Sequence, residues 1–295
     1  MFNVFNTLIF LPFVKPFAAL IRRLLPDKAH KVVEGAQYLD PKLIEATPGI
    51  AVEAVKNECA YMGFLAIHLL DSVQEVFFND KKDLIPKIEE TEAKIDQLHK
   101  AVKAYAEDIM QAGISDDAAR VLTLYVASSG NIERIGDYAV NIQEKAVELY
   151  EKEASFSDIA KNELKLLDSA LEQILTRTND AFENDDIALA RQVEPLEEVI
   201  DILVEKLRDG HIKRLKEGIC SIDTGVVFLD VLNNVERISD HCSNIAARLI
   251  GMNQGEDYDS HTLKSLMHHN PTKEYSLHYE QCCKDYLVPL EAMEA

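Results

Sequence analysis

The chain has 295 residues and carries a formal net charge of −20 at pH 7, from 31 basic and 51 acidic side chains. This acidic balance argues against nucleic acid as a partner, because a phosphate backbone needs a cationic surface. The composition favours helix, tryptophan is absent, and runs of alternating β-branched residues are missing, so we expect an all-α protein.

Residues 1–26 form an apolar segment that predicts insertion into a membrane. A helix over the first 21 residues would measure roughly 30 Å, one hydrocarbon thickness, although two prolines would kink it. Basic residues follow the segment, which places everything after residue 26 on the cytoplasmic side of the plasma membrane. The alternative is an amphipathic or core segment of a soluble protein. The residues that define the predicted membrane segment are Phe2, Leu8, Phe10, Leu11, Phe13, Arg22 and Arg23.

Residues 27–48 lack a sustained hydrophobic period and read as a linker. Beyond them, apolar residues recur at spacings of three and four, which predicts six long helices. Stripes of this length predict two tandem antiparallel three-helix bundles, over residues 49–152 and 153–252. Residues 253–295 lose the pattern and are expected to form an irregular tail. The six expected helices cover residues 50–79, 86–113, 115–146, 157–184, 185–218 and 222–251.

The two bundles arise from an internal duplication. Residues 131–142 and 234–245 each contain Glu-Arg-Ile-x-Asp followed by asparagine four residues after the aspartate. A second carboxylate pair, Glu92 and Asp96, matches Glu197 and Asp201 in the other half. The offsets are 236 − 133 = 103 and 197 − 92 = 105, so the halves superpose with a two-residue loop difference.

The repeated carboxylates predict cation binding on the bundle surface. Spacings of four residues place them in rows along helices, and their identities match between halves although neighbouring residues differ. A purely solvated helix face is the alternative. Carboxylate and amide oxygens suit hard cations, so we expect iron, manganese, zinc, magnesium or calcium, with several ions in each bundle. The predicted ligands are Glu92, Asp96, Glu133, Asp137, Asn141, Glu197, Asp201, Glu236, Asp240 and Asn244.

Enzymatic motifs are missing from the sequence. A di-iron oxygenase needs an inward-facing Glu-x-x-His on two helices, and His99 has only Val204 at the matching position. There is no glycine-rich phosphate loop, Gly-x-Ser-x-Gly elbow or His-Glu-x-x-His, and none of the five cysteines forms a Cys-x-x-Cys pair. We therefore expect a protein that is not an enzyme.

The motif Glu-Arg-Ile-Gly-Asp-x-Ala-x-Asn-Ile and its partner resemble the PhoU domain over residues of about 50–252. Ser239 and Cys242 replace the usual glycine and alanine. The resemblance implies multinuclear metal clusters on the bundle surface. The opening residues 2–13 are similar to the last membrane segment of bacterial sodium-dependent phosphate cotransporters, which often carry a PhoU domain at their C-terminus.

Together these resemblances imply a metal-binding regulatory domain of a sodium:phosphate symporter that acts in phosphate transport and homeostasis. Its partners would be a membrane phosphate transporter domain, in the same or a separate chain, and the lipid bilayer through residues 1–26. A homo-oligomer is compatible with the sequence. Two rivals are a metal-free acidic helical adaptor and a carboxylate-metal enzyme.

Overall fold

The computed structural model describes residues 35–254, 262, 265, 267 and 271–294. The chain divides into two units, Met1–Glu34 and Gly35–Ala295, of which the second is described below. The predicted membrane segment, from Phe2 to Arg23, therefore lies outside the described residues. Among the helices that are described, none combines the length and apolar character needed to cross a bilayer.

The described part of the second unit is helical and contains no strand, which confirms the predicted all-α class. Predicted and observed bounds of the long helices agree to within a few residues for most of them. Three short elements, α3 (Pro41–Ala46), η2 (Lys82–Leu84) and α8 (Ile187–Ala190), lie between or before the long ones. The long helices are α4 (Pro48–Asn79), α5 (Ile85–Ala112), α6 (Asp116–Glu151), α7 (Asp158–Asn184), α9 (Val193–Lys216) and α10 (Ile222–Gln254).

Local side-chain chemistry explains where these helices begin and end. The hydroxyls of Ser115 and Ser157 accept hydrogen bonds from the third backbone N–H after them, which caps α6 and α7. Asp80 and Asp185, equivalent in the two repeats, end α4 and α7 with left-handed backbone, at φ 55° and 51°. The helix expected over residues 185–218 is instead split into α8 and α9, because Asp186 caps a separate short turn.

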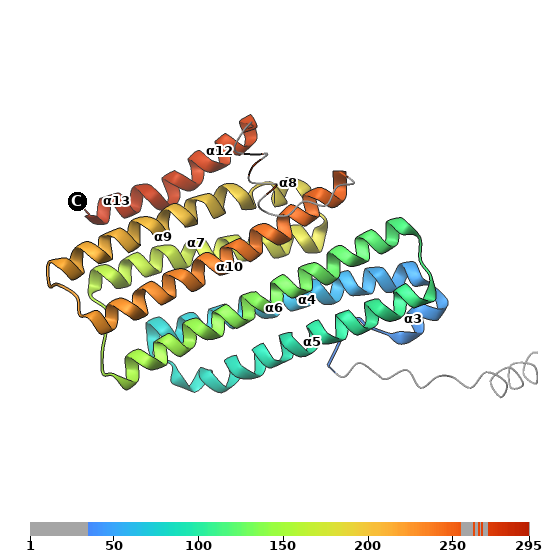
Figure 1. The fold of residues 1–295 in the computed structure, drawn as a ribbon, viewed down its shortest axis with the longest axis horizontal. Helices are drawn as coiled ribbons and strands as arrows, with labels where there is room; N and C mark the ends of the chain where they lie inside the picture. The colour runs from blue at the N-terminus through green and yellow to red at the C-terminus, as the bar shows by residue number, and fades with distance from the viewer. Residues whose placement is uncertain (1–34, 255–261, 263–264, 266, 268–270, 295) are drawn as a thin grey trace, which may run out of the picture. The chain divides into compact units, whose positions relative to one another are not determined.

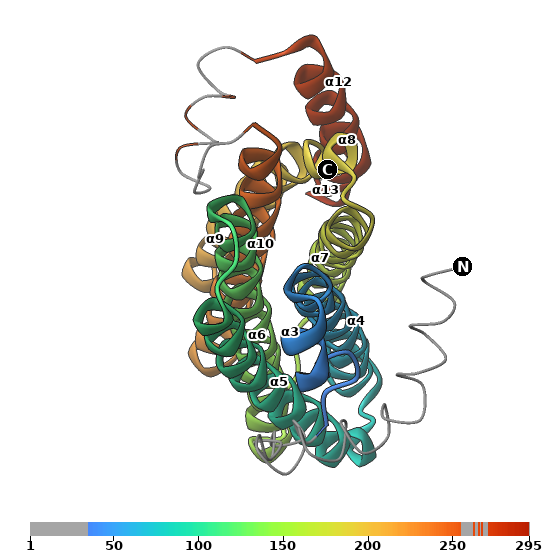
Figure 2. The same cartoon turned by 90° about the vertical axis from the view of Figure 1, so that its right-hand side faces the viewer.

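The long helices pack in two layers (Figures 1 and 2). One layer consists of α5, α6, α10 and α9 in a row. The second layer consists of α4 and α7, which pack against one face of that row. Within the first repeat α4, α5 and α6 contact one another, as α7, α9 and α10 do in the second. The repeats meet where α6 packs on α10 and α4 packs on α7. The interior between the layers is apolar and includes Met62, Leu69, Ile95, Leu171, Phe182 and Phe228.

The two repeats are related by an approximate twofold rotation, whose axis passes through the contact between α6 and α10, called the seam below. Contacts across it pair Asn131 with His241, Asn141 with Asn234 and Lys145 with Asp230, so the helices run antiparallel. Near its centre the rings of Tyr138 and His241 stack, with centroids 5.7 Å apart and an interplanar angle of 20°. These two residues occupy the same position in the two copies of the motif, so the rotation axis passes close to them.

The C-terminal segment differs from the irregular tail that we expected. α12 (Lys273–Cys282), a π-helical turn η3 (Cys283–Leu287) and α13 (Val288–Glu294) continue one another and pack on α9 and α7. Cys282, Tyr286 and Leu290, spaced by four residues, form the buried side of this segment. That spacing was visible in the sequence, but it is too short to stand out against the longer stripes.

Candidate cation-binding carboxylate clusters

The first carboxylate cluster consists of Glu92 and Asp96 on α5 and Glu133 and Asp137 on α6. Burial raises the pKa of Glu92, and the nearby charges of Asp137, Asp96 and Glu133 raise it further. The pKa of Asp137 is also raised, again by burial and then by Glu133 and Asp96. One carboxylate raises the pKa of another in this way only at short range. The two helices therefore place the four carboxylates near one another.

One basic residue partly neutralises this cluster. The ammonium group of Lys100 lies 2.5 Å from Asp96 Oδ2, one helical turn away on α5. Its side chain is 72% exposed, and an exposed pair of this kind adds little stability and exchanges readily. Within the described part of the chain no lysine or arginine forms an ion pair with Glu92, Glu133 or Asp137, although the charge of Arg134 acts on Asp137.

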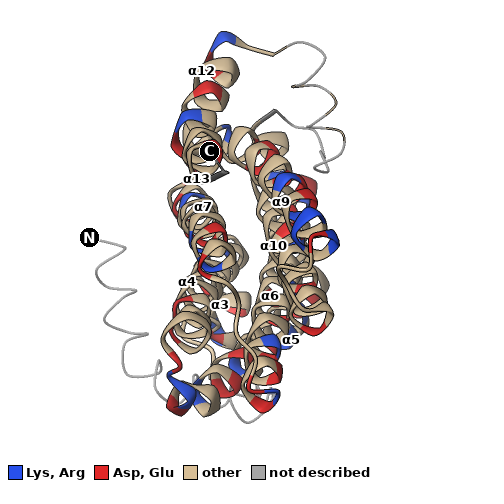
Figure 3. Ribbon diagram, turned by 90° about the vertical axis from the view of Figure 1, so that its left-hand side faces the viewer, with Lys and Arg blue, Asp and Glu red and all other residues tan. Residues whose placement is uncertain are grey.

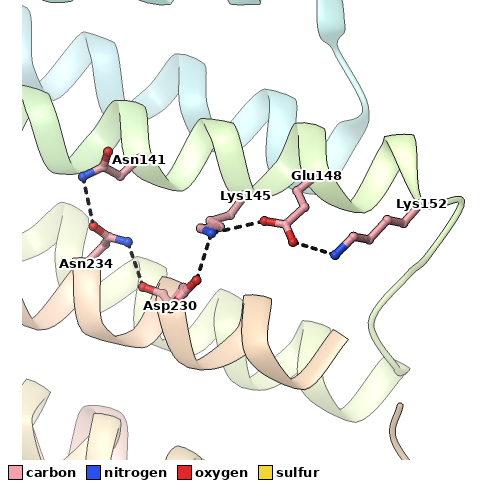
Figure 4. Close-up of polar contacts among 6 residues, drawn as sticks. All are labelled: Asn141, Lys145, Glu148, Lys152, Asp230 and Asn234. Carbon is pink, nitrogen blue, oxygen red and sulfur yellow. Dashed lines mark hydrogen bonds and ion pairs between the residues drawn. The ribbon is translucent and has the colours of Figure 1, made fainter. Parts of the chain in front are cut away.

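Asn141, the predicted fifth ligand of the first repeat, takes part in a different contact. Its amide donates to Asn234 Oδ1 on α10 at 3.4 Å, as Figure 4 shows. In the same figure Lys145 lies between Asp230 at 2.9 Å and Glu148 at 3.1 Å, and thereby links α10 to α6. Asn141 thus belongs to the seam between the repeats.

The second carboxylate cluster consists of Glu197 and Asp201 on α9 and Glu236 and Asp240 on α10. Glu197 is fully buried, which differs from the shallow surface patch that the sequence predicted. Glu236 Oε2 pairs with Arg208 at 3.2 Å, and Asp240 lies 3.9 Å from Arg237. The amide of Asn244, the remaining predicted ligand, donates to the backbone carbonyl of Asp240 at 3.0 Å. The two clusters share a sequence pattern but differ in burial and charge balance.

Two residues beside the second cluster were missed from the sequence. Glu194 is buried and accepts a hydrogen bond from Ser243 of α10. Tyr275 of α12 lies close enough to Glu194, Glu198 and Glu197 for their charges, together with burial, to raise its pKa. Glu194 could have been found from its match to Glu89 in the first repeat. Tyr275 could not, because it lies in the C-terminal segment, which has no counterpart in the repeat pattern. The C-terminal helix therefore borders this cluster.

The carboxylates do not already form a closed ion site. Within residues 35–254 and 271–294 no three His, Cys, Asp or Glu side chains converge as they would around a bound ion. The donors of the first cluster are carboxylate oxygens, two on each of two adjacent helices, and this donor type suits hard cations. Figure 3, viewed from the left-hand side of Figure 1, shows acidic and basic residues interspersed on the helices.

Comparisons with known proteins extend this picture. A family model described as "PhoU domain" matches residues 60–146 and 164–249, and each match contains one carboxylate cluster. A "Phosphate-specific transport system accessory protein PhoU homolog 1" of Thermotoga maritima is 27% identical over 205 residues, which cover 69% of this chain and 87% of that protein. The "Putative inorganic phosphate export protein YjbB" of Escherichia coli is 22% identical over 251 residues, 83% of this chain but only 45% of that protein.

Solved structures share the fold. The PhoU structure from Streptococcus pneumoniae superposes with a TM-score of 0.65 at 19% identity, over 72% of this chain and 100% of that chain. PhoU from Pseudomonas aeruginosa gives a TM-score of 0.65 at 22% identity, over 69% of this chain and 97% of that chain. At these identities the likeness concerns the arrangement of helices.

These findings correct the predicted location. We expected the chain to lie in the plasma membrane, on the strength of residues 1–26. The Thermotoga relative is by name an accessory protein of a transport system, the matched structures are of PhoU proteins, and no described helix could cross a bilayer. The prediction of a plasma-membrane location is therefore wrong.

Proposed function

This chain belongs to the PhoU domain family, and on that premise we propose that it is a non-enzymatic regulator of phosphate transport that binds multivalent cations at its carboxylate clusters. The regulatory role is supported by relatives named as accessory proteins of phosphate-specific transport. The words "accessory protein" in the names of these relatives also agree with a non-enzymatic role.

The first carboxylate cluster is the observation that carries the cation-binding part of the proposal. Burial, and after it the like charges that α5 and α6 bring together, raise the pKa values of Glu92 and Asp137, and a multivalent cation would relieve the repulsion between these charges. Oxygen donors favour iron, manganese or magnesium over softer metals, although zinc also accepts carboxylates. Glu92, Asp96, Glu133 and Asp137 would hold the ion or ions, with small rotamer changes.

For the partner, we propose a phosphate transport protein. Similarity to the phosphate export protein covers most of this chain but less than half of that relative, so a region like this one is part of a larger protein there. A sodium:phosphate symporter, the partner that the opening residues suggested, is the specific candidate.

The alternative is a metal-free acidic adaptor, and the ion pairs of the clusters favour it. Arg208 on Glu236 and Lys100 on Asp96 supply positive charge that would otherwise come from a cation. Such pairs are most extensive in the second cluster, so the alternative applies most directly to that repeat.

Cation titration of the full chain after chelation and dialysis distinguishes the two. We would titrate Mn²⁺, Fe²⁺ and Mg²⁺ calorimetrically and measure metal content by elemental analysis. The cluster variant Glu92→Gln/Glu133→Gln/Asp137→Asn should lose the tightest class of sites. The matched control Glu107→Gln/Asp108→Asn/Glu144→Gln removes three exposed carboxylates from the same two helices and should bind as the unmodified chain does. Equal metal content in both variants would favour the metal-free adaptor.

A further inference from the structure

We propose that Arg134 and Arg237, at the centre of the seam between α6 and α10, form a binding site for a tetrahedral oxyanion such as inorganic phosphate. The two arginines hold the same position in the two motif copies, because 237 − 134 = 103. The site would lie between the two carboxylate clusters.

Helix geometry brings both arginines to the stacked pair Tyr138 and His241. Arg134 lies three residues after Asn131, which hydrogen-bonds His241 at 2.9 Å, and four before Tyr138, which stacks on it. Residues at these spacings are neighbours on one helix face. Arg237 lies four residues before His241 on α10, so the two arginines approach this stack from opposite helices. Both guanidinium groups act on His241 electrostatically, which agrees with this placement.

Both arginines are available to a ligand. Arg134 is exposed, and the Arg237 side chain is 63% exposed. Arg237 has only a long contact of 3.9 Å with Asp240, and Arg134 makes no ion pair among the residues that the structure describes. Arg214, by contrast, is buried and bound by both carboxylate oxygens of Glu163.

The chemistry of two guanidinium groups on adjacent helices points to an oxyanion. Guanidinium presents N–H donors in a planar fork that matches two oxygens of one phosphate or sulfate, and two such forks can bind the four oxygens of a tetrahedral ion.

The neighbouring carboxylates oppose the anion. Glu133 and Asp137 flank Arg134 in sequence, and Glu236 and Asp240 flank Arg237 in the same way. Cations on the clusters would cancel this repulsion, so anion binding should be tighter in cation-loaded protein, and cation binding tighter in the presence of phosphate. In this respect the inference rests on the proposed function.

The test is calorimetric titration of inorganic phosphate, and separately of sulfate, into the full chain after chelation and again after loading with Mg²⁺. Arg134→Gln/Arg237→Gln should weaken phosphate binding by about tenfold or more for each charged hydrogen-bonding group removed. Arg134→Lys/Arg237→Lys should weaken it less, because charge is kept and only the fork is lost. Arg120→Gln, an exposed arginine at the start of α6, serves as the control and should bind normally.

The outcomes separate this inference from the proposed function. Phosphate binding that is unchanged in Arg134→Gln/Arg237→Gln, or no binding in either state, overturns the inference. A separate Mg²⁺ titration measures cation binding in the same variants, where it should persist. If Mg²⁺ and Mn²⁺ do not bind but phosphate binding still depends on both arginines, the cation proposal fails and the oxyanion site stands. Equal affinity for sulfate would support a general oxyanion site, whereas preference for phosphate would identify the ligand.

Discussion

The guanidinium group of Arg214 on α9 donates two hydrogen bonds to the carboxylate of Glu163 on α7, at 2.7 and 2.6 Å, and both side chains are nearly completely buried. In the first repeat the equivalent of Glu163 is Glu58, since 163 − 58 = 105. Its carboxylate is also buried, but it accepts from the backbone N–H groups of Gln37 and Tyr38 at 3.0 and 2.7 Å. One buried carboxylate is thus satisfied by an arginine in one repeat and by the entering main chain in the other.

Arg214→Met should lower the free energy of unfolding by about 3–5 kcal/mol, because it leaves the Glu163 carboxylate buried without its partner. The double variant Glu163→Leu/Arg214→Met should lose much less, since no uncompensated charge remains. Urea unfolding followed by circular dichroism measures both. Arg120→Met, which breaks an exposed pair with Asp117, is the control and should change little. A double variant as unstable as the single one would show that the packing of these side chains matters more than their charges.

The free energy of unfolding should fall as pH rises from about 4 to about 7, because of the buried carboxyl group of Asp168. Burial raises the pKa of this carboxyl to about 7 from 3.8, even though Gln74 donates a hydrogen bond to it at 2.7 Å. Because the folded state holds the proton more tightly than the unfolded state, the stabilisation is complete below about pH 4 and is lost as pH approaches 7. The difference is on the order of 2–4 kcal/mol.

Asp168→Asn should remove this contribution and make the chain more stable than the unmodified protein at pH 8. Urea unfolding at pH 5, 6, 7 and 8 provides the measurement. Gln74→Leu, which takes away the donor that favours the charged form, should move the midpoint of Asp168 upward in a carbon-detected NMR titration. The same pH slope in Asp168→Asn as in the unmodified chain would contradict the assignment to this residue.

Gly63→Ala should destabilise the packing of α4 on α7. A methyl group at this position would lie 2.0 Å from Asn179 Oδ1 and 2.9 Å from its Cγ, so α7 or the asparagine would have to move. We expect a loss of about 1–3 kcal/mol despite the better helix propensity of alanine. Asn179→Ala in the same chain should restore most of it. Gly49→Ala, on the same helix with no atom within 4 Å, should be neutral or stabilising.

Leu290→Ala should loosen the C-terminal segment without unfolding the six long helices. Leu290 is fully buried where α13 packs, on the same side of the segment as Cys282 and Tyr286. Hydrogen exchange monitored by mass spectrometry should show faster exchange over residues 273–294 and unchanged protection in α4 and α6. Met293→Ala, which truncates a side chain that is 45% exposed, is the control. Faster exchange throughout α7 and α9 would mean that the tail stabilises the second repeat as a whole.

Local sequence patterns were sufficient for the helices but not for their partners. The spacing of apolar residues placed α4 and α7 within two residues of their observed starts. No local pattern shows which helix a stripe faces, so the contact between α6 and α10 was not predicted. The tail was missed because its apolar stripe is short: of its residues whose burial the structure describes, Cys282, Tyr286 and Leu290 form the buried side.

The same distinction applies to the carboxylates. A spacing of four residues shows that Glu133 and Asp137 share a helix face, and the first cluster gathers as that face implies. It does not show what lies over the face. Glu197 is buried because helices of the second repeat and the C-terminal segment surround it, and Asn141 turns to the seam because α10 lies there. Both outcomes depend on residues about a hundred positions away.

The stacked rings of Tyr138 and His241 have a consequence for how this molecule can vary. If two separate, identical subunits met at this place, symmetry would force the same ring onto both sides of the axis, tyrosine on tyrosine or histidine on histidine. Covalent fusion of the halves lifts that constraint, and the chain uses the freedom to set a phenol against a neutral imidazole. Each half can therefore acquire its own chemistry, at the centre as well as at the edges, while the other half stays as it is.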